Sequence, residues 1–259
     1  MLGRRSQDNA LAVDLPRTPE GGPRMGPFAV IFPAAGQSRR FGDATRKKVD
    51  HEIDGRVVWT RAVEPFARRD DVAQLILAVA PEDRERFEAH YRETLSRLGI
   101  TLVEGGAERF DTVAACLDRI DPRCEFVAVH DAARPFPTQA VIDRVFEAAR
   151  TFGAALPGLP VSDTLKRAGD DGVITETVSR AGLFAVQTPQ AFRLDLLRRA
   201  HANRPNLAVP VTDDAQLVEA IGHPCRIVPG SPFNLKITTR EDLHLAEAIV
   251  RVLPREDAH

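Results

Sequence analysis

Residues 29–42 read AVIFPAAGQSRRFG, and residues 46–48 read RKK. The β-branched and aromatic residues over 28–33 predict a buried strand, and the small residues Ala34, Ala35 and Gly36 follow it directly. Because these three residues have almost no side chain, a ligand can lie against the backbone there. Backbone N–H groups of such a loop can cradle a phosphate. The stretch therefore predicts an anion-binding loop at the end of a strand.

Cations cluster directly after this loop. Arg40 and Lys47 lie seven residues apart, so they can converge on one anion from the two ends of a loop. We expect Arg39, Arg46 and Lys48 to be solvated. The spacing fits neither the P-loop pattern G-x-x-x-x-G-K-[ST] nor the dinucleotide pattern G-x-G-x-x-G. The loop therefore indicates a phosphate site of a different kind.

Composition limits the partners that the chain can have. A formal net charge of -2 over 259 residues gives no global attraction to nucleic acid or to an anionic membrane. No apolar run reaches the roughly 18 residues of a membrane span, and the N-terminus lacks the apolar core of a signal peptide. Cys116, Cys124 and Cys225 form no CxxC pair, which favours reduced thiols over a zinc site. We expect a cytoplasmic protein that binds neither nucleic acid nor membrane.

Apolar runs alternate with helical patterns along most of the chain. We expect strands at 28–33, 74–80, 100–103, 126–129, 183–187 and 226–228, and helices at 57–68, 81–98, 113–120, 141–149, 194–202, 214–221 and 241–252. This alternation predicts an α/β fold, a mostly parallel sheet with helices on both faces. We expect residues 27–253 to form a single domain, whereas 1–26 and 254–259 have the composition of solvated tails.

Three polar or small-residue segments end three of the predicted strands. They are residues 33–36, Gly105-Gly106 and His130-Asp131. In parallel sheets, ligands bind beyond the carboxyl ends of the strands. The coincidence of the three segments predicts one ligand site at that edge of the sheet.

Residues 158–178 interrupt the α/β pattern. Residues 160–167 and 173–178 alternate in polarity around a Gly-Asp-Asp-Gly turn, which predicts a long β-hairpin inserted as an arm. The arm carries Val161, Leu165, Ile174 and Val178. Because an isolated hairpin is marginal in water, we expect it to clasp a second subunit in a two-fold homodimer.

Six motifs in order carry a resemblance that covers roughly residues 28–252. They are 33–47, GGAERFDTV at 105–113, VHDAARP at 129–135, PVSDTLKR at 160–167, QTPQ at 187–190 and NLKIT at 234–238. Together they resemble the 2-C-methyl-D-erythritol 4-phosphate cytidylyltransferase family. The resemblance implies a Rossmann-like nucleotidyltransferase fold. It also implies transfer of CMP from CTP to the phosphate of methylerythritol phosphate, with release of pyrophosphate and a requirement for Mg²⁺.

The resemblance also implies residue roles. Arg40 and Lys47 match the cations that stabilise the transition state, and Asp131 matches the Mg²⁺ ligand. The nucleotide would contact Ala34, Ala35, Gly36, Gly106 and Thr112. The acceptor would contact Arg134, Thr164, Arg180, Thr188 and Lys236, with Thr164 reaching the site of a neighbouring subunit. We expect His130 to be a packed strand-end histidine, because the chemistry does not require it.

The chain departs from the family pattern at a few positions, and other functions compete. Ser38 stands where the family often has Gly, Arg46 where Pro is common, Lys48-Val49 where Gln-Tyr is common, and Phe233 where Asp is frequent. A ribitol-phosphate or other polyol-phosphate cytidylyltransferase would share the nucleotide loop. A non-catalytic nucleotide-binding module would keep the fold, although the presence of Lys47 and Asp131 argues against it. Sugar-1-phosphate uridylyltransferases and molybdopterin cytidylyltransferases share the opening loop but not the ordered set of motifs.

Overall fold

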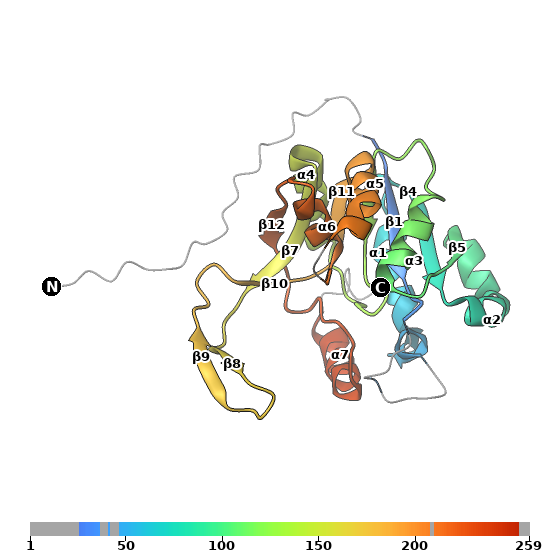
Figure 1. The fold of residues 1–259 in the computed structure, drawn as a ribbon. Coiled ribbons are helices and arrows are strands. Elements are labelled where there is room, and N and C mark those ends of the chain that lie inside the picture. The colour runs from blue at the N-terminus through green and yellow to red at the C-terminus, as the bar shows by residue number, and fades with distance from the viewer. Residues whose placement is uncertain (1–25, 37–40, 42–46, 208–209, 254–259) are drawn as a thin grey trace.

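The computed structural model describes residues 26–36, 41, 47–207 and 210–253 (Figure 1). The predicted tails, apart from Gly26, lie outside these residues, as do Ser38, Arg39, Arg40 and Arg46. An eight-stranded sheet forms the centre, with the strand order β10-β7-β11-β6-β1-β4-β5 and with β12 beside β7. The predicted α/β class is therefore confirmed.

Four neighbouring strands run parallel and position the site. They are β1 (Phe28–Pro33), β4 (Val72–Val79), β5 (Ile100–Glu104) and β6 (Phe126–Val129). In register, Ile31 of β1 lies opposite Ile76 of β4 and Val129 of β6. The carboxyl ends of all four strands consequently meet at one edge of the sheet.

The other half of the sheet is mixed. Strand β11 (Gln190–Arg193) runs antiparallel between β6 and β7 (Ala154–Pro160), and β10 (Phe184–Val186) runs antiparallel to β7. Strand β12 (Arg226–Pro229) pairs with β7 in the parallel sense. Strands β7 and β11 are absent from the sequence-based prediction, so that part of the prediction was wrong by omission.

Helices cover both faces of the sheet. Successive residues of each strand point to opposite faces, and the strands are apolar at both, so each face needs a helical layer to bury it. Phe28, Val30 and Phe32 of β1 pack against the layer formed by α1 (Val58–Ala67), α2 (Arg84–Arg97) and α4 (Gln139–Phe152). Ala29 and Ile31 pack against the layer formed by α3 (Arg109–Leu117), α5 (Leu194–Asn203) and α6 (Asp214–Ala220). Within the described residues, no helix combines the length and the apolar character that spanning a bilayer requires.

Smaller elements complete the edge where the strands end. Helix α7 (Arg240–Val252) packs in a third apolar cluster with Phe41, Ile53 and Phe136. The short pair of β2 (Glu52–Ile53) and β3 (Arg56–Val57) precedes α1. The 3-10 turns η2 (Lys48–Asp50) and η3 (Pro81–Asp83) lie before β2 and after β4, and η4 (Arg204–Asn206) follows α5.

The predicted hairpin arm is present and projects away from the sheet (Figure 1). It consists of β8 (Leu165–Ala168) and β9 (Ile174–Val178), which pair in the antiparallel sense and form a separate two-stranded sheet. Its predicted boundaries need correction, because residues 158–160 belong to β7 and the first arm strand begins at Leu165 rather than at Pro160. Val173 and Ile174 are each 60% exposed, so the tip presents apolar side chains to solvent.

Candidate active site

A cavity of about 590 Å³ lies where the four parallel strands end. Its walls are the segments that directly follow β1, β4, β5 and β6, together with parts of η2 and the chain near Lys236. Its lining residues are Pro33, Ala34, Ala35, Gly36, Lys48, Val49, Ala80, Pro81, Glu82, Gly105, Gly106, Ala107, Glu108, Arg109, Thr112, Asp131, Ala132, Ala133 and Lys236. The site expected at this edge of the sheet is therefore a real cavity.

Three of the wall segments, those after β1, β5 and β6, are hydrogen-bonded at their start to the neighbouring strand. The amide of Ala34 donates to the Ala78 carbonyl oxygen at 2.7 Å, and the amide of Gly105 donates to Val79 at 2.7 Å. The amide of His130 donates to Ile31 at 2.9 Å. The sheet thus fixes the floor of the cavity before any side chain contributes.

Positions 105 and 106 require glycine, because neighbouring atoms lie where a Cβ atom would stand. A Cβ atom on Gly105 would lie 2.6 Å from the Cβ of Ala35, and one on Gly106 would lie 2.4 Å from the Cβ of Asp111. Thr112 also shapes this loop, because its Oγ1 accepts from the Gly106 amide at 3.1 Å and donates to the Glu108 carbonyl oxygen at 3.0 Å. The predicted nucleotide residues therefore line the cavity from two sides, Ala34, Ala35 and Gly36 after β1, and Gly106 and Thr112 after β5.

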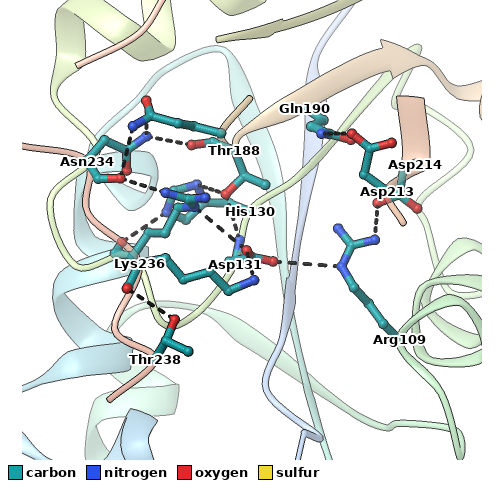
Figure 2. Close-up of polar contacts among 12 residues, drawn as sticks. Arg109, His130, Asp131, Thr188, Gln190, Asp213, Asp214, Asn234, Lys236 and Thr238 are labelled. Carbon is teal, nitrogen blue, oxygen red and sulfur yellow. Dashed lines mark hydrogen bonds and ion pairs between the residues drawn. The ribbon is translucent and has the colours of Figure 1, made fainter. Parts of the chain in front are cut away.

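Three cationic side chains surround the carboxylate of Asp131 (Figure 2). Its side chain is nearly buried, and its Oδ2 lies 2.7 Å from Lys236 Nζ and 3.7 Å from Arg134 Nε. Its Oδ1 lies 3.8 Å from Arg109 Nε. Burial alone would raise the pKa of this carboxyl, but Lys236, Arg109 and Arg134 hold it far below its usual range. Asp131 is consequently an ionised carboxylate beside the cavity.

Arg109 is a cavity residue to which the sequence-based prediction gave no role. It is the first residue of α3, and its Nη1 lies 2.7 Å from Oδ2 of the fully buried Asp214. Burial opposes the charge of Arg109, yet Asp214 and Asp131 together raise its pKa. Asp214 also contacts His201 Nε2 at 3.2 Å. A cation is thus fixed between two carboxylates at the wall of the cavity.

Arg134 and Thr188, predicted to contact the acceptor, lie behind Asp131 instead of lining the cavity. Thr188 Oγ1 accepts from the Asp131 amide at 3.0 Å, and Arg134 Nη1 donates to the Asn234 carbonyl oxygen at 2.7 Å. Both residues hold Asp131 and the segment before Lys236 in place. His130 is fully buried between them, and burial lowers its pKa to about 4, which confirms the expectation of a packed histidine.

Of the basic residues after the loop, the described part of the chain includes Lys47 and Lys48, and Lys48 differs from expectation. Lys48, predicted to be solvated, is half-buried and lines the cavity. Lys47, predicted to act on the phosphates, lies just outside the lining, with its Nζ 2.5 Å from Asp83 Oδ2. Arg40 cannot be placed, because it lies outside the described residues. The segment therefore brings Lys48 to the cavity, whereas Lys47 pairs with Asp83 outside the lining.

Thr164 and Arg180 lie at the base of the arm, and neither lines this cavity. Both are exposed, and Arg180 Nη1 donates to the Ser162 carbonyl oxygen across the base. Within one chain, the structure therefore does not bring them together with Asp131 and Lys236.

The donor set near Asp131 allows a hard cation with few protein ligands. Among the residues that the structure describes, no group of three or more His, Cys, Asp or Glu side chains could hold a metal ion. Asp131 supplies one ionised carboxylate beside a cavity large enough for a nucleotide, and Mg²⁺ commonly takes its remaining oxygens from water and substrate phosphates. Asp131 would therefore supply one ligand to a magnesium ion, in competition with Lys236, which pairs with its Oδ2 in this structure.

The fold and the cavity define the class of the protein. A parallel sheet with a small-residue loop after its first strand, and with cations and a carboxylate at the same edge, is the architecture of an α/β protein that binds a phosphorylated ligand.

Comparisons with known proteins give the family. The model of the family 2-C-methyl-D-erythritol 4-phosphate cytidylyltransferase matches residues 28–252. The chain is 44% identical over 234 residues to a relative of that name from Rhodopirellula baltica, covering 86% of this chain and 94% of the relative. It is 40% identical over 225 residues to one from Bacillus cereus, covering 87% and 98%. This chain belongs to the 2-C-methyl-D-erythritol 4-phosphate cytidylyltransferase family.

Solved structures agree. The chain is similar to the 2-C-methyl-D-erythritol 4-phosphate cytidylyltransferase of Thermus thermophilus, with a TM-score of 0.71, 37% identity and coverage of 86% of this chain and 98% of that chain. It is also similar to the 4-diphosphocytidyl-2C-methyl-D-erythritol synthase of Anaerococcus prevotii, with a TM-score of 0.75, 28% identity and coverage of 87% and 96%. The predicted resemblance is confirmed.

Proposed function

We propose that this chain transfers CMP from CTP to the phosphate of 2-C-methyl-D-erythritol 4-phosphate and releases pyrophosphate. The observation that carries the proposal is the cavity itself, which combines a backbone wall at Ala34, Ala35 and Gly106 with the charged cluster of Asp131 and Lys236. Family membership supplies the two substrates.

The reaction joins two anions, so the protein must neutralise charge and hold the reactants in line. An oxygen of the acceptor phosphate attacks the α-phosphorus of CTP and forms a new P–O bond. The bond between the α-phosphorus and its bridging oxygen breaks, and the electron pair leaves with pyrophosphate. Lys47 and Arg40 are proposed to stabilise charge on that leaving group, whereas Lys236 at the cavity is proposed to bind the acceptor phosphate.

Asp131 is proposed to hold Mg²⁺, which when bound draws charge from the phosphates of CTP. Addition of EDTA should therefore abolish turnover, and excess Mg²⁺ should restore it. Asp131→Asn should keep the shape of the side chain and lose activity over the usual range of Mg²⁺. A variant that folds and keeps full turnover would exclude Asp131 as the ligand.

The arm is proposed to complete the acceptor site of a second subunit. Thr164 and Arg180 lie at its base and outside their own chain's cavity, which a homodimer would explain if they serve the partner's cavity. The exposed apolar tip at Val173 and Ile174 supports an interface there.

We also propose a cytoplasmic location. Cys116, Cys124 and Cys225 are free thiols, and Cys116 and Cys124 are buried. Fractionation of cells that express the chain would check this, with recovery in the membrane or secreted fraction as the contrary result.

One assay tests the function. The chain is incubated with CTP, Mg²⁺ and a panel of polyol phosphates, and pyrophosphate release is followed. We expect turnover with methylerythritol phosphate. Efficient turnover of ribitol phosphate, with none of methylerythritol phosphate, would assign the chain to the neighbouring activity, and no turnover with any acceptor would favour a non-catalytic module.

A further inference from the structure

Lys47 forms an ion pair with Asp83, a residue to which the proposed reaction gives no role. Its Nζ lies 2.5 Å from Asp83 Oδ2, and the two side chains are only 21% and 19% exposed. Lys47 immediately precedes Lys48 and Val49, and Asp83 immediately follows Pro81 and Glu82; all four of these neighbours line the cavity. The ion pair therefore joins the two chain segments that carry these wall residues.

Asp83 itself is held by the short turn that follows β4. It ends the turn η3 directly after β4, where its amide donates to the Ala80 carbonyl oxygen at 3.0 Å. Its side chain does not cap α2, so the carboxylate is available to its cations. Burial works against the charge, but Lys47 and Arg86 lower the pKa of Asp83. The carboxylate facing Lys47 is therefore ionised at neutral pH.

We propose that Asp83 is a positioning residue that places the ammonium of Lys47 for phosphoryl transfer, an inference that rests on the proposed function. A lysine side chain is a flexible stem with many rotamers, whereas the carboxylate of Asp83, held in the turn η3, confines the charge of Lys47 to one place. The negative charge of Asp83 also has an unfavourable effect, because it repels the triphosphate of CTP and so weakens CTP binding. Asp83 thus favours catalysis at the expense of CTP affinity.

This opposition gives a signature that a purely structural residue would not produce. Asp83→Asn should lower kcat by about tenfold or more, because small misplacements of a reacting group cost about that much. The KM for CTP should stay the same or fall. Asp83→Glu keeps the charge and should restore part of kcat, and thermal unfolding of each variant shows whether the fold is intact.

Two controls isolate the contact. Arg86→Gln removes the other cation on Asp83, at 3.3 Å, and should leave kcat within about twofold of wild type. In a Lys47→Ala background, Asp83→Asn should have almost no further effect on kcat, because the two residues act as one unit.

The outcomes separate the inference from the function. A folded Asp83→Asn variant with wild-type kcat, beside an inactive Lys47→Ala variant, overturns the positioning role alone. An Asp83→Asn variant that raises the KM for CTP and leaves kcat unchanged also overturns the positioning role. A Lys47→Ala variant with full kcat overturns the role of Lys47 and the inference together.

Discussion

Lys47 is the described residue whose charge we expect the reaction to need most. Lys47→Ala should lower kcat by about 10²-fold or more, as loss of one electrostatic donor typically does, and should weaken CTP binding less. Steady-state kinetics against CTP would measure both. Arg92→Ala, an exposed cation on α2, is the matched control and should change little. An unchanged kcat in Lys47→Ala would contradict the assignment.

Lys48 is a poor control for that experiment, although the sequence-based prediction treats it as solvated. It lines the cavity, and the turn η2 places it there. Removal of Lys48 should therefore raise the KM for CTP, by about tenfold if its ammonium reaches a phosphate. Equal KM values in Lys48→Ala and wild type would show that the triphosphate does not reach it.

His130 makes stability depend on pH. Its folded pKa is about 4, below the ordinary value near 6.5, because it is buried without charge. The unfolded chain therefore binds the proton first, and stability is lost as pH falls from about 6.5 toward 4, by roughly 3 kcal/mol in total. Denaturant unfolding should show a flatter pH profile over this range for His130→Gln than for wild type. His90→Gln, at an exposed position, should follow wild type; the same slope in all three proteins would contradict the argument.

Single residues also show where sequence reasoning stops. Asp131 could be predicted, because it directly follows a clear strand. Its three cations could not, since Arg109, Arg134 and Lys236 reach it from separate elements. Arg109 stands beside the glycine pair in the sequence, which is a signal that could have indicated it. The partnership of Lys47 with Asp83 depends on the end of β4 and leaves no local pattern.

At the scale of elements, strong patterns were predicted well and weak ones were missed. Strand β6 has the predicted bounds, because an unbroken apolar run leaves little choice. Strand β7 contains Pro157, Gly158 and Pro160, residues that argue against a strand in any local interpretation. Helix α3 begins at Arg109, four residues before the predicted start, since Glu108 and Asp111 form a capping box.

The arm is the element with the clearest test. Because Val173 and Ile174 are exposed on its tip, an interface there would bury them, and charge would disrupt it. Ile174→Asp should convert a dimer to monomers at micromolar concentration, as measured by sedimentation. Leu245→Asp changes an apolar side chain that is 53% exposed on α7, and it should leave assembly unchanged. A stable, fully active wild-type monomer would exclude the clasp.

At the scale of the whole molecule, the acceptor site is predicted to be shared. Arg180→Ala should raise the KM for the acceptor far more than the KM for CTP, and Lys236→Ala should also impair the acceptor step. If Arg180 serves the partner's cavity, a mixed dimer of the two variants contains one intact site. Reassembly of the mixed variants should then recover about a quarter of wild-type activity, by the symmetry of random pairing. No recovery, with mixed dimers demonstrated, would mean that both residues serve the same chain's site.

The hydrogen bonds that attach the cavity floor to the sheet also predict how the site opens. The amides of Ala34, Gly105 and His130 each donate to an adjacent strand. Ala34 and His130 follow the central strands β1 and β6, where an amide exchanges its hydrogen with solvent only when the sheet opens, so these two should be among the slowest to take up deuterium; Gly105 follows the outermost strand β5 and should exchange earlier. Opening of the floor would then coincide with global unfolding rather than with a local fluctuation. A nucleotide bound on this floor should therefore slow exchange throughout the sheet, far from any atom that it touches.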